Sequence, residues 1–149
     1  MTLWHELEVG TQISTESRTV SAEEVREFAL EFDPQPYHLD ADAAENSIFG
    51  GLCASGWQAN AITMQLLTEA LQHDNIALMG VRSVTQCRWK LPLFVGDTVS
   101  AKINLESKRD DTYDPRFGLC LCSVVLENQN EKPVLLMNTE LLISKQLSD

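Results

Sequence analysis

The stretch SGWQANAITMQLLTEALQH, residues 55–73, carries the longest helical pattern in the chain. Its apolar residues recur at spacings of three and four around most of the helix circumference, and they include Trp57, Ala61, Ile62, Met64, Leu67 and Leu71. A helix that is apolar nearly all round is a buried helix, because an exposed helix keeps a polar face. We therefore predict a long helix at the centre of the fold, enclosed by the rest of the chain.

Four strand-like segments follow this helix. They cover residues 79–91, 97–109, 117–128 and 134–144, and short sequences rich in Pro, Gly, Asn and Asp separate them. One long buried helix followed by four consecutive strands favours an antiparallel sheet wrapped around the helix, which is an α+β layout. Because the chain contains no linker or repeat, we expect residues 1–149 to form a single domain.

The N-terminal part predicts two shorter helices after a strand-like segment at residues 4–15. Ser21 and Glu24 form a capping box at the start of the first helix. The apolar residues that share one face of this helix are Val25, Phe28, Ala29 and Phe32. The helix must end at Asp33, since a residue before proline is pushed out of the helical region. Asp40 is the expected N-cap of the second helix.

The composition excludes several classes of function. With 22 Asp and Glu against 11 Lys and Arg, the net charge is −11, which disfavours a nucleic-acid partner. The chain shows no leader-like or membrane-spanning apolar run, so we expect a cytoplasmic protein without a membrane partner. The cysteines are Cys53, Cys87, Cys120 and Cys122. They form no C-x-x-C pair and the chain has only three His, so we expect reduced core thiols and no metal site.

Asp33 and His38 lie in FDPQPYHLD, residues 32–40, which two prolines make stiff. Residues five apart in an extended chain are separated by about 17 Å, so the two side chains meet only if the backbone folds back. Pro34 and Pro36 make such a fold less costly in entropy, because each fixes its own φ and restricts the residue before it. A carboxylate and an imidazole that converge here can hold a water for acid–base chemistry. Alternatively, Asp33 only ends a helix and His38 is an ordinary loop residue.

The segment FDPQPYHLDADAAENSIFGGLCASGW, residues 32–57, resembles the signature of the MaoC-like, or (R)-specific enoyl-CoA hydratase, family. That signature reads D-x-N-P-x-H, followed by F-G and by A-H-G or A-S-G. Residues 90–111, KLPLFVGDTVSAKINLESKRDD, are similar to the family's strand, proline turn, G-D and next strand, so the resemblance extends over residues 28–109. It implies a hotdog fold, an antiparallel sheet around a long central helix, which is the layout that the residues themselves predict. It also implies a homodimer or a higher homo-oligomer.

The resemblance implies a hydratase or dehydratase that interconverts a trans-2-enoyl-CoA and a 3-hydroxyacyl-CoA without a further cofactor. Asp33 would activate a water for attack on the β-carbon, His38 would position that water, and the pair would return a proton to the α-carbon. The backbone N–H of Gly56 would stabilise the negative charge on the thioester oxygen. This role suits Gly56, because the unpaired N–H groups and the positive end of the dipole lie at the start of a helix.

Two positions depart from the family pattern. Gln35 stands where the family usually carries Asn, which changes the length of the amide side chain beside the predicted water. Ser55 belongs to the A-S-G version of the later motif, and Gln58 follows it closely. These three residues are predicted to contact or surround the substrate, and Trp57 is a candidate for the acyl pocket as well as for the core.

Positive residues that suit the phosphates of CoA gather on and after the strand segments, at Arg82, Arg88, Lys90, Lys102, Lys108 and Arg109. Alternatively, each of them is an ordinary residue on the solvent-exposed face of a strand and has no role in binding. Arg88 and Lys90 are our candidates for substrate binding, and Arg88 and Gln58 for a polar end of the acyl group. CoA is favoured over an acyl-carrier protein, because a carrier protein is itself acidic and would be repelled by this chain.

Two alternatives to the hydratase remain open on the sequence. An acyl-CoA thioesterase on the same fold would direct a water at the thioester carbonyl, although the D-x-x-P-x-H arrangement argues against it. A non-catalytic acyl-CoA-binding protein would keep the loop without turnover, and Gln35 is the feature that favours this reading.

Overall fold

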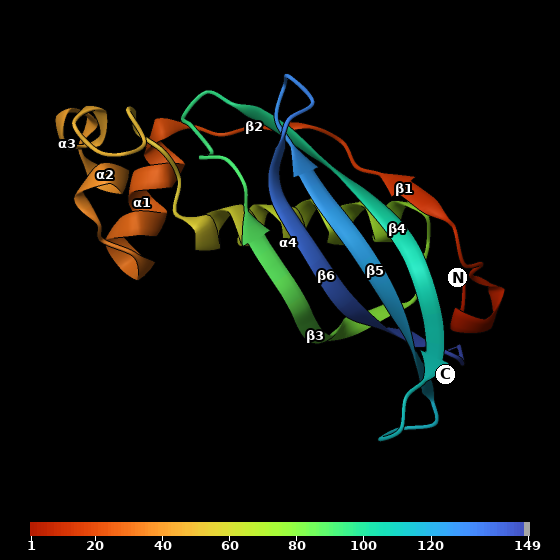
Figure 1. Cartoon of the computed structure of the whole chain (residues 1–149). Coiled ribbons are helices and arrows are strands. Elements are labelled where there is room, and N and C mark those ends of the chain that lie inside the picture. Colours follow the sequence, from red (N-terminus) through yellow and green to blue (C-terminus); the bar gives the residue numbers. More distant parts are fainter. Residues whose placement is uncertain (148–149) are drawn as a thin grey trace.

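The computed structural model describes residues 1–147 and consists of one antiparallel sheet, one long helix and a group of short helices (Figure 1). The helices are α1 (Ala22–Phe32), α2 (Pro36–Leu39), α3 (Ala41–Glu45) and α4 (Gly56–His73), with a 3-10 turn, η1, at Trp4–Glu6. The strands are β1 (Gln12–Ser14), β2 (Arg18–Thr19), β3 (Leu78–Trp89), β4 (Thr98–Asp110), β5 (Phe117–Glu127) and β6 (Pro133–Ser144). The predicted α+β layout is confirmed.

The sheet has the strand order β1-β4-β5-β6-β3, with β2 paired to β4. Strands β4, β5 and β6 form a meander with continuous antiparallel pairing, and β3 pairs with β6 through pairs such as Trp89 with Leu135. Strand β3, the first long strand after the central helix, therefore lies at an edge of the sheet, where no other strand among residues 1–147 pairs with one side of its backbone. Figure 1 shows the sheet curving along α4, with α1, α2 and α3 grouped near the start of that helix.

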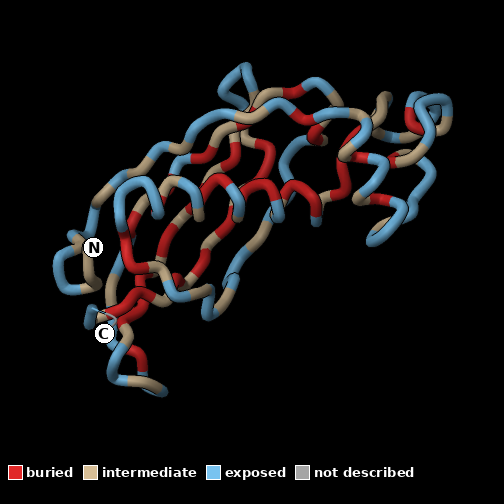
Figure 2. Tube along the Cα trace, turned by 180° about the vertical axis from the view of Figure 1, so that it is seen from behind, coloured by how far each residue is buried: buried red, intermediate tan, exposed pale blue. Residues whose placement is uncertain are grey.

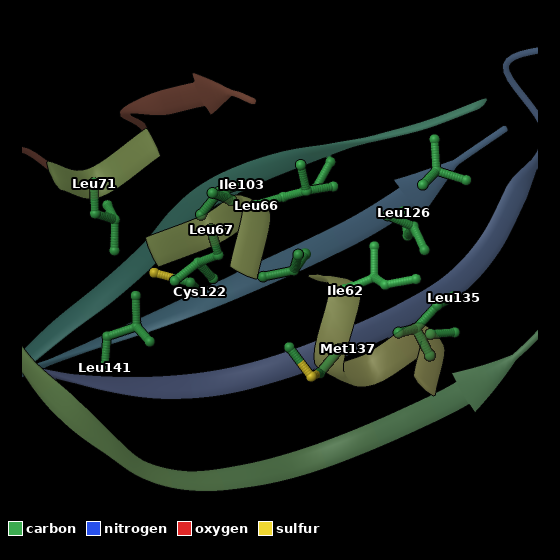
Figure 3. Packing of buried hydrophobic residues seen from close by; sticks show 14 of the residues in the cluster. Ile62, Leu66, Leu67, Leu71, Ile103, Cys122, Leu126, Leu135, Met137 and Leu141 are labelled. Carbon is green, nitrogen blue, oxygen red and sulfur yellow. The ribbon is translucent and has the colours of Figure 1, made fainter. Parts of the chain in front are cut away.

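The core lies between α4 and the concave face of the sheet (Figure 3). Leu67 on the inner face of α4 is fully buried, as are Leu126 on β5 and Leu135 on β6. Alternate residues of β4, β5 and β6 point inward, which is the period-two pattern of a half-buried strand. Each fully buried side chain of this size contributes about 1.5–3 kcal/mol of apolar burial, so this layer holds α4 against the sheet.

The prediction that α4 is enclosed on all sides is wrong. Ile62, Leu67 and Leu71 are buried, but Ala61 is exposed and the side of the helix that begins at Trp57 faces solvent, with Trp57 itself 64% exposed. The reason is that the sheet covers only one side of the helix, as the exposed ribbon along the outer turns in Figure 2 shows. The apolar residues on the outer side therefore form an uncovered surface.

The N-terminal predictions are confirmed in part. The capping box holds, since the Ser21 hydroxyl accepts from the backbone N–H of Glu24, and α1 ends at Asp33 as expected. Phe32, predicted on the buried face, is 65% exposed, and η1 replaces the beginning of the predicted strand at residues 4–15. Asp40 caps α3 through the N–H of Ala43, whereas the four-residue helix α2 had not been predicted.

No helix within residues 1–147 is long and apolar enough to cross a membrane.

Candidate active site

Asp33 and His38 are brought together by a tight reversal of the chain after α1. The N–H of Asp33 closes the last turn of α1 on Ala29, and Pro34 prevents the helix from continuing. The N–H of Gln35 then donates to the Asp33 carbonyl at 2.8 Å, and the N–H of His38 donates to the Gln35 carbonyl at 3.0 Å. As a result, His38 Nε2 lies 3.4 Å from Asp33 Oδ2, so the predicted convergence of carboxylate and imidazole is present.

The imidazole of His38 has a defined tautomer. Its ring is buried, and Nδ1 lies 2.7 Å from the backbone carbonyl oxygen of Cys53. A carbonyl only accepts, so Nδ1 carries the proton and donates it to this bond. In the neutral ring Nε2 is therefore the unprotonated nitrogen, and its lone pair is directed toward Asp33. Tyr37 packs edge-on against the ring at 4.5 Å between centroids and fixes its plane.

The carboxylate of Asp33 has a second partner. The hydroxyl of Ser55 donates to Asp33 Oδ2 at 2.7 Å, and Ser55 is fully buried. A hydrogen bond from a buried hydroxyl to a carboxylate is among the stronger ones in proteins and fixes the orientation of the acceptor. Ser55, which the sequence placed among the substrate-binding residues, thus contacts Asp33.

Ser55 also begins the central helix. It is the N-cap of α4, and its hydroxyl accepts a 3.3 Å hydrogen bond from the N–H of Trp57. Gly56 is the first helical residue, and its N–H has no hydrogen-bond partner within residues 1–147. Gly56 lines the same cavity as Asp33 and His38. An unpaired donor at a helix N-terminus is suited to a developing negative charge.

The cavity beside this pair has a volume of about 420 Å³. Its polar side is formed by Asp33, His38 and Cys53, and the exposed Lys90 adds a positive charge. The remaining walls are apolar or aromatic, and they are formed by Tyr37, Phe49, Ala54, Trp57, Ala59, Trp89, Leu91, Pro92, Leu93 and Val134. A mostly apolar cavity with a few converging polar groups is the usual form of a small-molecule site.

The nine site residues predicted from the sequence divide into three groups. Five line the cavity, namely Asp33, His38, Gly56, Trp57 and Lys90. Ser55 lies behind Asp33. The other three, Gln35, Gln58 and Arg88, lie outside the cavity: Gln35 and Arg88 are exposed, and Gln58 is buried against α1, where its Nε2 donates to the Glu24 carbonyl.

Sequence reasoning missed part of the lining. Cys53 had been assigned to the core, and Tyr37, Phe49, Ala59 and Val134 had not been singled out. Tyr37 precedes His38 directly in the sequence and was the available signal, whereas Phe49 lies eleven residues later and contacts Tyr37, at 5.0 Å between ring centroids, only in the folded chain. Val134 and Ala59 come from distant segments and carry no local signal.

Cys53 does not behave as a nucleophile paired with His38. Its sulfur lies 3.9 Å from Nδ1, but that nitrogen already donates to the Cys53 carbonyl. Burial raises the pKa of the Cys53 thiol from 9.0 to about 11, because the thiolate is poorly solvated there. The thiol is therefore neutral near neutral pH. Within residues 1–147, no group of three or more His, Cys, Asp or Glu side chains is arranged to hold a metal ion.

Comparisons with known proteins agree on one family. The model of the MaoC like domain matches residues 6–116. The crystal structure of a MaoC-like dehydratase from Rhodospirillum rubrum superposes with a TM-score of 0.86 at 30% identity, covering 99% of this chain and 100% of that one. The (R)-specific enoyl-CoA hydratase of Aeromonas caviae is 30% identical over 105 residues, which is 70% of this chain and 75% of that protein.

The structure of the (R)-hydratase from A. caviae also superposes, with a TM-score of 0.68 at 25% identity over 93% of this chain and 96% of that one. These likenesses confirm the hotdog fold, in which the sheet formed by β3 to β6 wraps α4. Because the family model spans most of the sequence and the fold agrees over nearly its whole length, the chain belongs to the MaoC-like dehydratase domain family.

Proposed function

We propose that the protein adds water across the C2–C3 double bond of a trans-2-enoyl-CoA, and catalyses the reverse dehydration of a 3-hydroxyacyl-CoA. The observation that carries this proposal is the pair in the cavity wall: Asp33 Oδ2 lies 3.4 Å from His38 Nε2, the nitrogen that is unprotonated in the neutral ring because Nδ1 donates to the Cys53 carbonyl. Such a pair offers two acceptors to one water, and a water held by two acceptors keeps its oxygen lone pair available for attack.

The reaction then balances with this chain's own groups. As the water oxygen forms a bond to C3, one water proton passes to the Asp33 carboxylate, and the double-bond electrons move toward C2 and the thioester oxygen. A proton from the Asp33–His38 pair is delivered to C2, which gives the 3-hydroxyacyl product and restores the pair. The Ser55 hydroxyl holds Asp33 in place throughout, since it donates to the carboxylate at 2.7 Å.

The backbone N–H of Gly56 would donate a hydrogen bond to the thioester oxygen and stabilise the negative charge that develops there. This N–H is unpaired within residues 1–147 and lies at the start of α4, where the helix dipole is positive. Removal of one such donor typically costs about 10²–10³ in rate. Asp33, His38 and Gly56 line the same cavity, which supports assigning the water-binding pair and the donor for the enolate oxygen to one site.

Arg88 and Lys90 are the residues we propose for the CoA phosphates. Of the six positive residues singled out in the sequence, Arg82, Lys102 and Arg109 form salt bridges, and Lys108 donates to a backbone carbonyl. Arg88 and Lys90 form no salt bridge within residues 1–147, and both are exposed near the end of β3 that contributes to the cavity. Two free cations beside the cavity suit an anionic carrier group.

We also propose that two copies pair through β3. Within residues 1–147 the outer edge of this twelve-residue strand has no partner strand, and its side chains Met79, Val81 and Val84 are exposed at 53%, 40% and 50%. A long apolar edge strand is a template for a further strand, and an antiparallel contact with a second β3 is closed by two-fold symmetry. Val84→Lys should therefore yield monomer in light scattering at micromolar concentration. Val9→Lys, at a site that is 60% exposed on the N-terminal segment, is the matched control, and equal effects of both changes would contradict this pairing.

The test of the activity is an ultraviolet assay with crotonyl-CoA and a longer enoyl-CoA, which follows loss of the conjugated-thioester absorbance. Asp33→Asn and His38→Ala should each lower the rate by at least about 10²-fold. Asp74→Asn and His73→Ala are matched controls, since these residues form an exposed Asp–His pair at the C-terminal end of α4.

The two alternatives give different results in the same assay. Release of free thiol at the rate of absorbance loss would indicate a thioesterase. Binding of the thioesters without turnover in the wild type would indicate a non-catalytic binding protein. Gln35 was the residue that favoured a non-catalytic binding protein. Its side chain is exposed and lies outside the cavity, so this argument is weakened.

A further inference from the structure

Trp89 ties the edge strand to the first turn of the central helix. It is the last residue of β3, and its indole Nε1 donates to two acceptors on α4, the Gly56 carbonyl at 2.9 Å and Asn60 Oδ1 at 3.0 Å. Asn60 in turn donates from Nδ2 to Cys87 Sγ at 3.3 Å, two residues earlier on the same strand. Trp89 and Cys87 of β3 are therefore hydrogen-bonded to the first turn of α4, which contains the cavity residue Gly56.

The indole ring also lies directly against Gly56. A Cβ placed on Gly56 would stand 2.7 Å from Trp89 Nε1 and 2.9 Å from Cε2, distances at which something must shift. Any residue larger than glycine at this position would require the indole, which is 47% exposed, to move away. Trp57, the next residue along α4, also packs edge-on against Trp89 with 5.3 Å between ring centroids, so two consecutive residues of the first turn contact the indole.

This arrangement answers a physical difficulty of the site. Gly56 would supply the N–H for the thioester oxygen, but glycine is the residue with the greatest backbone freedom, and the first residue of a helix has no intrahelical bond at its own N–H. An N–H donor whose position fluctuates contributes little to stabilising the transition state, because a misplacement of about 1 Å can cost on the order of a hundredfold in rate. A hydrogen bond to the Gly56 carbonyl, on the adjoining peptide group, restricts this freedom.

We propose that Trp89 is a positioning residue that holds the first turn of α4 so that the Gly56 N–H points at the thioester oxygen. The inference rests on the proposed hydratase activity and adds to it a residue outside the acid–base pair. Trp89 acts through its indole N–H and its contact with the Gly56 backbone, while Asn60 acts as the second acceptor that keeps the ring in place.

The test compares two variants, each of which replaces one tryptophan by phenylalanine and so removes one indole N–H donor. Trp89→Phe retains an aromatic ring against Gly56 but removes its N–H. Trp4→Phe is the matched control, because Trp4 Nε1 donates to the Leu119 carbonyl on β5 and neither residue lines the cavity. In Trp89→Phe, kcat should fall by about ten- to a hundredfold, with KM changing much less and the shape of the pH profile unaltered.

A spectroscopic measurement separates positioning from general stability. A slowly reacting β-aryl enoyl-CoA absorbs at longer wavelength when its carbonyl is polarised by a donor. The red shift on binding should appear with the wild type and with Trp4→Phe, and should be reduced in Trp89→Phe even where the melting temperature and oligomeric state are unchanged. A full red shift together with an unchanged kcat in Trp89→Phe would overturn the role of Trp89.

A double-variant cycle tests the contact with Gly56 itself. Gly56→Ala should lower kcat strongly in the wild type, because the new methyl group meets the indole. In the Trp89→Ala background the same change should cost several-fold less, since the ring is absent. Equal fold-losses in both backgrounds would overturn the contact argument. A wild type that neither hydrates enoyl-CoA nor shifts the probe would instead refute the proposed function, and with it the role of Trp89.

Discussion

Alkylation of Cys53 tests the electrostatics of the cavity directly. Its thiol lies in the lining beside His38 and is 1% exposed, and burial raises its pKa from 9.0 to about 11. Only the thiolate reacts with iodoacetamide, so the rate follows the ionised fraction. At pH 8 a thiol with a pKa of 9.0 is about 10% ionised and one with a pKa of about 11 is about 0.1% ionised, a difference of roughly a hundredfold.

The pH dependence of this rate is the clearer signature, because limited access slows the reaction at every pH alike. In the native protein, the rate at Cys53 should rise about tenfold per pH unit from pH 8 and level off only near pH 11. In urea the same residue should level off near pH 9. Quantitative mass spectrometry of tryptic peptides after short labelling times resolves this site from Cys87, Cys120 and Cys122.

A native profile that levels off near pH 9 would refute the reasoning, since it would mean that the thiolate forms in a solvated environment. A rate at pH 8 equal to that in urea would do the same. Either result would reopen the possibility of Cys53 as a nucleophile beside His38. The expected profile would show that the thiol beside the imidazole is neutral near neutral pH.

Three further predictions concern binding and stability. Lys90→Glu should raise KM for a CoA thioester about tenfold, and the difference from wild type in a steady-state assay should shrink as salt is added. Gly118→Ala should lower the free energy of unfolding by about 1–3 kcal/mol in urea titrations, because the new Cβ would lie 2.4 Å from the Trp4 ring; an unchanged midpoint would contradict that packing. Leu67→Ala should lower it by about 2–5 kcal/mol, whereas Leu30→Ala, at a residue 68% exposed, should stay within about 0.5 kcal/mol.

Local patterns were sufficient to predict most of the secondary structure. The span of α4 follows from its apolar spacing together with the Ser55 cap, and the four long strands follow from turn sequences that separate β-rich segments. Helix α2 was missed because four residues are too few to show a period, although Pro36 at its first position is typical of a helix start.

Which faces are buried was harder to predict, because burial depends on the tertiary arrangement. Phe32 and Trp57 lie on apolar faces that the sequence assigned to the core, yet both are mostly exposed. An apolar helix face indicates that a partner surface is needed, but it does not distinguish a surface of the same chain from that of another molecule. The exposed apolar residues of α4 and β3 illustrate this ambiguity.

The same distinction explains how far the site could be predicted. Asp33 and His38 are five residues apart, and the prolines between them are a local signal for the reversal that brings the carboxylate to the imidazole. Their supports come from far along the chain: the Cys53 carbonyl sets the tautomer of His38, and the Ser55 hydroxyl orients Asp33. No local pattern encodes such contacts, because they exist only once α1, α2 and the start of α4 have packed together. The acid–base chemistry of Asp33 and His38 can therefore be predicted from a short motif, whereas the exact placement of the two side chains depends on the fold. For this reason we expect variants of remote contacts, such as the hydrogen bond of Trp89 to Gly56, to change the rate although the motif is intact.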